Sequence, residues 1–284
     1  MNTPILVTGA TGTIGQALVK QLQDRGAKFA VMSSRLGLEV GGQTTVLGDM
    51  ADPASLHQAF TGVETLFLLF PYQANAIALA RNAVHAAQLA GVKHIVRSSG
   101  AGADASSPVS IARMQGEIDQ LIEQSGIEYT LLRPNGFMQN WVNFAAGQIK
   151  AGNYAAPNGD GAISVIDVRD IAEVAAIVLT DPAAHAGKSY SLTGGEALST
   201  AQQVAMVAAA AGRPVRYDDI TEAQAKAAML GWGMDPQVVE WTLSLSHVYK
   251  QGWGAGISPD VQMLTGHAPR RFADFVAENA AAWR

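Results

Sequence analysis

A glycine-rich turn between an apolar segment and a helical segment constrains the fold of this chain more than any other feature. Residues 5–7 are apolar, and residues 8–15 read TGATGTIG, with glycines at positions 9, 12 and 15. Residues 17–22 then carry apolar side chains at helical spacing. A strand that runs into a glycine turn and then a helix can hold a pyrophosphate at the helix N-terminus. The segment therefore predicts a dinucleotide-binding βα unit.

The three glycines have separate expected roles. Gly9 permits a tight turn, Gly12 lets backbone amides approach the phosphates, and Gly15 lets helix and strand pack closely. The spacing differs from the G-x-G-x-x-G of long-chain dehydrogenases, and the alternative is a glycine-rich turn that binds nothing. The residues expected at the cofactor phosphates are Gly9, Thr11, Gly12, Thr13 and Ile14.

Strand-like and helical segments alternate up to about residue 135, which predicts an α/β fold of the Rossmann type. The strand-like segments are 5–7, 29–32, 45–47, 66–70, 93–96 and 129–132, and the helical ones are 17–24, 53–60, 75–90 and 108–125. Alternation with short connections implies right-handed crossovers and a doubly wound parallel sheet.

The alternation stops after Arg133 and Pro134. Further helices are expected at 138–149, 169–180, 200–211, 221–230, 235–251 and 270–283, with strands at 163–165 and 189–193. We expect a nucleotide-binding domain over 1–135, with 160–195 returning to it. Residues 136–160 and 196–284 are expected to form a smaller, mostly helical C-terminal lobe that holds the substrate.

Composition excludes several classes of function. The net charge of −5 and the lack of a basic run argue against a nucleic-acid partner. The chain has no cysteine, no room for a signal peptide before Ile5 and no apolar run of about 20 residues, so we expect a soluble cytoplasmic protein that does not bind membranes. The histidines lack metal-ligand spacing, so no metal is expected. The oligomeric state is open between monomer and homodimer.

Several motifs in order resemble one family. They are the opening TGATGTIG, Gly48-Asp49, GVKHIV with Ser98-Ser99, YTLLRPN at 129–135, DVRDIA at 167–172, Leu192-Thr193-Gly194 and TGHAPRRF at 265–272. Nearly end to end, the chain is similar to atypical short-chain dehydrogenase/reductases of the NmrA-like group. Within that group it resembles NAD(P)H:quinone oxidoreductases and triphenylmethane-dye reductases.

The chain departs from ordinary short-chain dehydrogenases at their Tyr-x-x-x-Lys pair. The positions expected for that tyrosine and lysine fall near Ile111 and Gln115. Neither side chain can do acid–base work at neutral pH. The NmrA-like group commonly lacks the pair, so the departure agrees with the resemblance and argues against alcohol–ketone chemistry.

NADPH is the expected cofactor, with NADH possible. The end of the second strand reads Met32-Ser33-Ser34-Arg35, without the acidic residue that binds the ribose diol in NAD-selective folds. A guanidinium and a hydroxyl suit the 2′-phosphate of NADP, although Arg35 could be only a solvated loop residue. The resemblance further implies cofactor contacts from Asp49, Met50, Phe70, Pro71 and Ser98.

Catalytic candidates are polar residues that follow the strands. Ser99 could face the substrate or simply satisfy a turn, and Tyr72 could donate a proton, stack on an aromatic acceptor or only pack. Asn140 could hold a carbonyl oxygen of the acceptor. Aromatic and apolar residues expected to line the substrate, or alternatively to fill a core, are Phe137, Met138, Trp141 and Trp232.

These observations predict an NADPH-dependent reductase that passes a hydride to a quinone, azo, dye-like or other conjugated small molecule. One alternative is a non-catalytic NAD(P)-sensing regulator of the NmrA type. Another is a biosynthetic reductase or isomerase that acts on an enone or imine. The residues do not identify the hydride acceptor or the proton donor.

Overall fold

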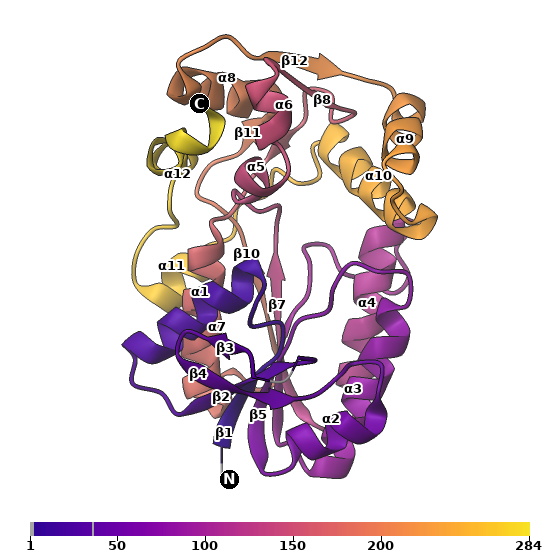
Figure 1. Cartoon of the computed structure of the whole chain (residues 1–284), viewed down its shortest axis with the longest axis vertical. Helices are drawn as coiled ribbons and strands as arrows, with labels where there is room; N and C mark the ends of the chain where they lie inside the picture. Colours follow the sequence, from indigo (N-terminus) through magenta and orange to yellow (C-terminus); the bar gives the residue numbers. More distant parts are fainter. Residues whose placement is uncertain (1–2, 36) are drawn as a thin grey trace. The chain divides into compact units, whose positions relative to one another are not determined.

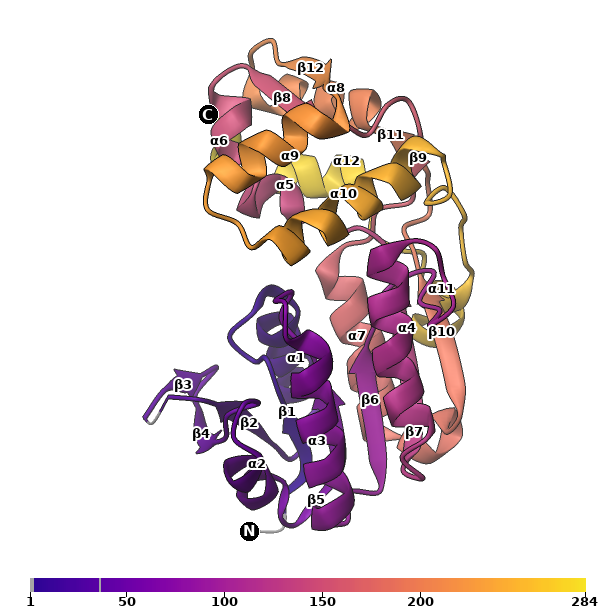
Figure 2. The ribbon, with the colours of Figure 1, turned by 90° about the vertical axis from the view of Figure 1, so that its right-hand side faces the viewer.

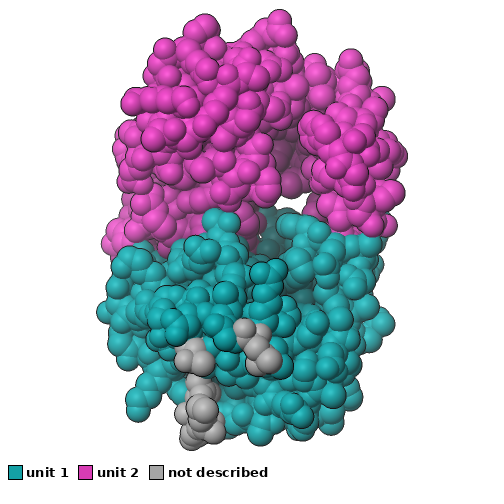
Figure 3. Space-filling view, viewed as in Figure 1, with its two compact units in different colours: residues 1–107, 112–133, 171–190 teal, residues 108–111, 134–170, 191–284 magenta. Residues whose placement is uncertain are grey.

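The computed structural model describes residues 3–35 and 37–284, and the chain divides into two compact units (Figure 3). Unit 1 comprises residues 1–107, 112–133 and 171–190. Unit 2 comprises residues 108–111, 134–170 and 191–284. The chain therefore returns to unit 1 over a shorter stretch than the expected 160–195.

Unit 1 is built on an eight-stranded sheet in the order β10-β7-β6-β5-β1-β2-β4-β3 (Figure 2). Its strands are β1 (Thr3–Val7), β2 (Phe29–Ser33), β3 (Glu39–Val40), β4 (Gln43–Leu47), β5 (Val63–Leu68), β6 (His94–Ser98), β7 (Glu128–Pro134) and β10 (Lys188–Leu192). β3 pairs antiparallel with β4, and the other neighbours are parallel. From β1 the chain moves outward to β2 and β4 and then returns to β5 on the other side of β1. The order of strands therefore reverses between β1 and β5.

Helices cover both faces of this sheet. They are α1 (Thr13–Asp24), α2 (Pro53–Phe60), α3 (Ala76–Ala90), α4 (Ser110–Glu123) and α7 (Val168–Thr180), with a 3₁₀ turn at Pro182–His185. In Figure 1, α1 and α7 lie on one side of the strands and α2, α3 and α4 on the other. The predicted Rossmann-type, doubly wound parallel sheet is confirmed.

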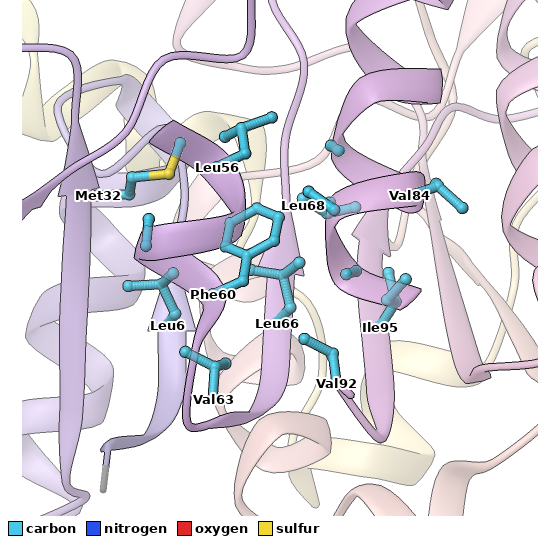
Figure 4. Packing of buried hydrophobic residues seen from close by; sticks show 14 of the residues in the cluster. Leu6, Met32, Leu56, Phe60, Val63, Leu66, Leu68, Val84, Val92 and Ile95 are labelled. Carbon is cyan, nitrogen blue, oxygen red and sulfur yellow. The ribbon is translucent and has the colours of Figure 1, made fainter. Parts of the chain in front are cut away.

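A core between β5, β6 and the helices α2 and α3 fixes the strands at the reversal point (Figure 4). Leu66, Leu68, Ile95 and Phe60 are completely buried. Burying a side chain of this size contributes roughly 1.5–3 kcal/mol. The run of apolar residues in β5 is what a parallel strand buried on both faces requires. The loops that follow these strands therefore start from rigid positions.

Unit 2 combines short helices with two small strand pairs. β8 (Asn153–Ala156) pairs parallel with β12 (Arg216–Asp219), and β9 (Ala162–Ile163) pairs antiparallel with β11 (Leu198–Ser199). The helices are α5 (Asn140–Asn143), α6 (Ala146–Lys150), α8 (Thr200–Ala211), α9 (Glu222–Gly231), α10 (Pro236–Lys250), α11 (Asp260–Thr265) and α12 (Phe272–Glu278), with a 3₁₀ turn at Ala280–Trp283. Its main core surrounds Phe272, Phe275 and Trp283.

The structure differs from the helix predicted at 138–149. Two short helices, α5 and α6, replace it, and they are separated at Phe144, whose φ is −123°. The chain enters this region extended, because Phe137 forms a β-bridge with Ile166 and the Met138 amide donates to the Ile166 carbonyl at 2.9 Å. A residue held in a β-bridge keeps an extended backbone, so the first helix of this region begins only at Asn140. The tertiary pairing therefore overrides the helical spacing.

Candidate functional site

The reversal between β1 and β5 is where a doubly wound sheet opens a crevice at the carboxyl ends of its strands. Thr8, directly after β1, is fully buried and joins the two strand ends. Its hydroxyl donates to the Phe67 carbonyl at 2.9 Å and accepts from the Leu69 amide at 3.1 Å. The turn that follows β1 is thereby fixed beside the loop that follows β5. Thr8 was not among the predicted site residues, although it begins the TGATGTIG motif.

The glycine turn has the shape of an anion cradle. Gly9 has a φ of +66°, and the Gly12 amide donates to the Gly9 carbonyl at 3.0 Å to close the turn. Gly12 is the N-cap of α1 and has no side chain with which to cap the helix. A Cβ on Gly15 would lie 2.1 Å from the Gly9 carbonyl oxygen, so no other residue allows this approach. The first amides of α1 thus point into the crevice with a positive helix end behind them.

The other predicted phosphate contacts lie along the same turn. Thr11 and Thr13 are exposed, and their contact with a cofactor stays a prediction. Ile14 is only 4% exposed, and its side chain faces the core. Any contact from Ile14 must therefore come through its backbone amide. The turn fits a pyrophosphate because it offers backbone donors, small side chains and no carboxylate.

The residues that were predicted to bind the 2′-phosphate lie at the end of β2 and are exposed to solvent. Ser34 and Arg35 are both exposed, and the Arg35 amide donates to the Ser33 hydroxyl at 3.0 Å. Within residues 3–35 and 37–284, Arg35 makes no ion pair. Its guanidinium is therefore free to bind an added phosphate.

The predicted adenine and ribose contacts follow β4 and β5. Asp49 is exposed, and its carboxylate accepts from the Ala51 amide at 2.9 Å, which shapes the loop after β4. The Met50 carbonyl accepts from Asn82 Nδ2 at 3.1 Å. Phe70 is partly buried against the core, and Pro71 is exposed. These residues follow the carboxyl ends of two parallel strands of the same sheet, and their cofactor contacts stay a prediction.

A buried polar network lies at the end of β6, where Ser98 and Ser99 were predicted to act. Arg97 is 1% exposed and forms an ion pair with Asp119 of α4, which is 2% exposed. The Ser99 hydroxyl accepts from Arg97 Nη1 at 3.0 Å and donates to Asp119 Oδ2 at 2.9 Å. Arg133 Nη2 donates to the same carboxylate oxygen at 3.1 Å. Ser98 is 5% exposed and ends the strand. The hydroxyl of Ser99 therefore already uses its donor and an acceptor position within the network.

Gln115 connects this network to Tyr72. Arg97 Nη1 donates to the Gln115 carbonyl at 2.9 Å, and Arg97 Nη2 donates to Gln115 Oε1. Gln115 Nε2 donates to the Tyr72 hydroxyl at 3.1 Å. Tyr72 is 54% exposed, and its hydroxyl is the end that lies against the buried amide. Desolvation there raises the pKa of Tyr72, while the Gln115 hydrogen bond and the Arg97 charge lower it.

The sequence carried a signal for this network that the predictions did not use. Arg97 is the charged residue of a strand that is buried along its whole length, and Gln115 and Asp119 are four residues apart on one helix face. A charged residue in a fully buried strand needs a partner of opposite charge. Burial lowers the pKa of Arg97 to about 9. Which helix supplies the partner depends on tertiary packing.

The predicted substrate residues belong to unit 2. Met138 and Trp141 are 1% and 7% exposed and lie in its core, where Trp141 Nε1 donates to Gln203 Oε1 at 2.8 Å. Phe137 is partly buried, and Asn140 is exposed at the start of α5. Trp232 is 71% exposed at the end of α9. Their contact with substrate stays a prediction, and the structure gives Trp141 a packing role as well.

Neither a metal centre nor a membrane-spanning helix is found in the described ranges 3–35 and 37–284. No three His, Asp or Glu side chains there are grouped to hold a metal ion. No helix in those ranges has the length and apolar character needed to cross a membrane.

Comparison with known proteins places the chain among reductases. It is 39% identical over 283 residues to the NAD(P)H azoreductase of Xenophilus azovorans, covering 98% of this chain and 99% of that protein. The crystal structure of an NADPH-dependent quinone oxidoreductase from Escherichia coli, complexed with NADPH, superimposes with a TM-score of 0.86 at 29% identity, covering 96% and 99% of the two chains. The Citrobacter sp. triphenylmethane reductase complexed with NADP(H) gives a TM-score of 0.83 at 26% identity, covering 97% and 99%.

The family assignment rests on a match to a family model and on the similarity to the individual proteins above. The model of the NmrA-like family matches residues 1–258, which include the glycine turn, β6 with its buried arginine, and the helices from α1 to α10. This match confirms the resemblance drawn from the motifs. The chain belongs to the NmrA-like family.

Proposed function

We propose that this protein is an NADPH-dependent oxidoreductase that reduces a quinone, azo, dye-like or other conjugated small molecule. The observation that carries the proposal is the glycine cradle at the β1–β5 reversal, with an exposed Ser34–Arg35 pair at the end of β2. The similar azoreductase, quinone oxidoreductase and triphenylmethane reductase support the class of acceptor.

Different residues of unit 1 would bind different parts of the dinucleotide. The amides that follow Gly12 would hold the pyrophosphate, and Arg35 with Ser34 would hold the 2′-phosphate. The ends of β5 and β6 would lie along the nicotinamide. When bound, the reduced cofactor supplies a hydride. The chain has to orient the acceptor and supply any proton that its product needs.

The direct test is the loss of NADPH absorbance when the purified protein meets a panel of quinones, azo compounds and cationic triphenylmethane dyes. NADH is run in parallel. Turnover of at least one acceptor class, faster with NADPH, is the expected result. Tight NADPH binding without turnover of any acceptor would contradict a reductase and favour a nucleotide-sensing role.

Replacing Arg35 with alanine is expected to lower the preference for NADPH over NADH by about 10- to 100-fold. Loss of a charge-assisted hydrogen bond costs about 1.5–3 kcal/mol, and only NADPH carries the phosphate that receives it. The measurement is kcat/KM for both cofactors at constant ionic strength. Lys20→Ala, which removes an exposed cation from α1 in the same unit, is the control. An unchanged ratio in Arg35→Ala would show that Arg35 is a solvated loop residue.

A further inference from the structure

Tyr72 stands at the open end of a hydrogen-bonded chain that begins at a buried arginine. Tyr72 lies in the loop after β5, the strand that neighbours β1 in the sheet. Gln115 of α4 donates a hydrogen bond to its hydroxyl. Gln115 is 9% exposed and Arg97 1%, whereas Tyr72 is 54% exposed. The chain of hydrogen bonds therefore runs from the interior of unit 1 to a hydroxyl on a side chain that meets solvent.

The chemistry of each group fixes the direction of these hydrogen bonds. A guanidinium has donors and no acceptor, so the Gln115 atom that faces Arg97 must be its oxygen. The amide nitrogen of Gln115 then faces Tyr72, 3.1 Å from the phenol oxygen. That nitrogen can only donate, so the phenol oxygen accepts. The Tyr72 hydroxyl proton is consequently left to point toward another group.

From this geometry we propose that Tyr72 donates the proton that accompanies hydride transfer, with Gln115 and Arg97 as positioning residues. The proposal rests on the proposed reductase function. It assigns the task of the missing short-chain tyrosine to a residue on a different element, and it gives Gln115 a task at the position expected for the missing lysine.

Ser99, the other candidate near this position, is poorly suited to the task. Its hydroxyl already donates to Asp119 at 2.9 Å and accepts from Arg97 at 3.0 Å. It is 7% exposed, so a proton that it lost could not readily be replaced from solvent. Within residues 3–35 and 37–284 the Tyr72 hydroxyl accepts from Gln115 and donates to no other group, and the residue is 54% exposed.

The step balances for an azo acceptor. One nitrogen of the N=N bond gains the hydride, and the electron pair of the π bond moves to the other nitrogen. That nitrogen takes the proton from the Tyr72 oxygen, which becomes a phenolate. The Gln115 N–H and the nearby Arg97 charge stabilise the phenolate. Solvent then returns the proton.

A cationic triphenylmethane dye provides an internal comparison. Its central carbon gains the hydride, and the positive charge is neutralised, so the product needs no proton. The two acceptors therefore share hydride transfer and differ in their need for an acid. Loss of a group that acts only as an acid therefore slows turnover of the azo compound and leaves turnover of the dye unchanged.

The first experiment compares turnover of an azo compound and a cationic triphenylmethane dye by Tyr72→Phe. We expect the ratio of azo to dye turnover to fall by about 100-fold, the lower end of the usual contribution of a general acid. Tyr129→Phe removes a phenol from β7 of the same unit and should leave the ratio unchanged. An unchanged ratio in Tyr72→Phe, with active wild-type protein, would overturn the proposal and leave the reductase function standing. A wild-type protein inert toward every acceptor would overturn both.

Gln115→Glu tests the direction of the hydrogen bonds. The carboxylate still accepts from Arg97, so the buried guanidinium keeps a partner, but it cannot donate to Tyr72. The Tyr72 hydroxyl would then donate to Glu and lose its open direction. We expect the azo-to-dye ratio to fall about 10-fold or more in Gln115→Glu, and the double variant with Tyr72→Phe to match Tyr72→Phe alone.

A titration supplies a reading that does not depend on turnover. The difference in tyrosinate absorbance between wild type and Tyr72→Phe isolates the ionisation of Tyr72. Gln115→Glu removes a donor to the phenolate and adds a negative charge, so it should move this ionisation to higher pH. An ionisation of Tyr72 at the same pH in wild type and Gln115→Glu would overturn the positioning role of Gln115.

Discussion

Replacing Gly12 with valine is expected to lower NADPH affinity by more than about 100-fold and to leave the fold intact. A Cβ at this position meets only the Gly9 carbonyl oxygen, at 3.3 Å, and the backbone angles of φ −80° and ψ 173° suit any residue. The valine methyl groups would, however, occupy the space through which a pyrophosphate approaches the first amides of α1. Losing two charge-assisted hydrogen bonds at about 1.5–3 kcal/mol each accounts for the expected effect.

Titration calorimetry with NADPH measures this effect, and the thermal unfolding midpoint reports on the fold. Gly147→Val is the matched control, because that glycine lies in α6 of unit 2 and a Cβ added there would have nothing within 4 Å. Gly15→Val is less informative, since a Cβ there would lie 2.1 Å from the Gly9 carbonyl oxygen and would disturb the turn itself. Unaltered NADPH affinity in Gly12→Val would show that the cradle does not bind the dinucleotide.

Replacing Asp119 with leucine is expected to lower the free energy of unfolding by about 3–5 kcal/mol, because it leaves Arg97 buried without its carboxylate. Asp119 also accepts from Ser99 at 2.9 Å and from Arg133 at 3.1 Å, so three donors lose their acceptor together. A loss of this size is a large part of the roughly 5–15 kcal/mol typical of folded domains. Urea unfolding of the variant and the wild type measures it.

The matched control is Asp24→Leu, which breaks the exposed pair between Lys20 and Asp24 at the end of α1. Exposed pairs contribute about 0–1 kcal/mol, so a small change is expected. The double variant Arg97→Leu/Asp119→Leu should recover part of the loss, because it removes both buried charges. If Asp119→Leu were no more destabilising than Asp24→Leu, the buried pair would not hold α4 to β6.

Local sequence patterns were sufficient to predict seven of the eight strands of the sheet in unit 1, and the two-residue strand β3 was not predicted. The apolar segments 5–7, 66–70 and 93–96 coincide with β1, β5 and β6 to within a few residues. Parallel strands buried on both faces leave a continuous apolar run, and helices leave a 3.6-residue period, so both can be read locally. In unit 2, β8 and β12 were not predicted, because they are short and their pairing partners are about sixty residues apart in the chain.

In the candidate site, too, the sequence predicted one part and did not predict another. Residues 8–15 identified the nucleotide cradle, since a glycine at a positive φ and a glycine at a close approach both leave a mark in the sequence. Tyr72 was a candidate, yet nothing local indicated that Gln115, 43 positions away, donates to its hydroxyl. Side chains that meet at the carboxyl ends of neighbouring strands can be paired only when the order of the strands is known.

The fold class, the position of the dinucleotide cradle and the family could all be inferred from the amino-acid sequence, because they depend on periodicity and on glycines at fixed spacing. Which polar side chains contact one another could be learned only from the tertiary structure. Packing brought Asp119 and Gln115 of α4 to Arg97 of β6, and it committed the Ser99 hydroxyl while leaving that of Tyr72 with an open direction. A buried charge must find its partner wherever the packing of distant elements places one, and that requirement leaves no local pattern in the sequence.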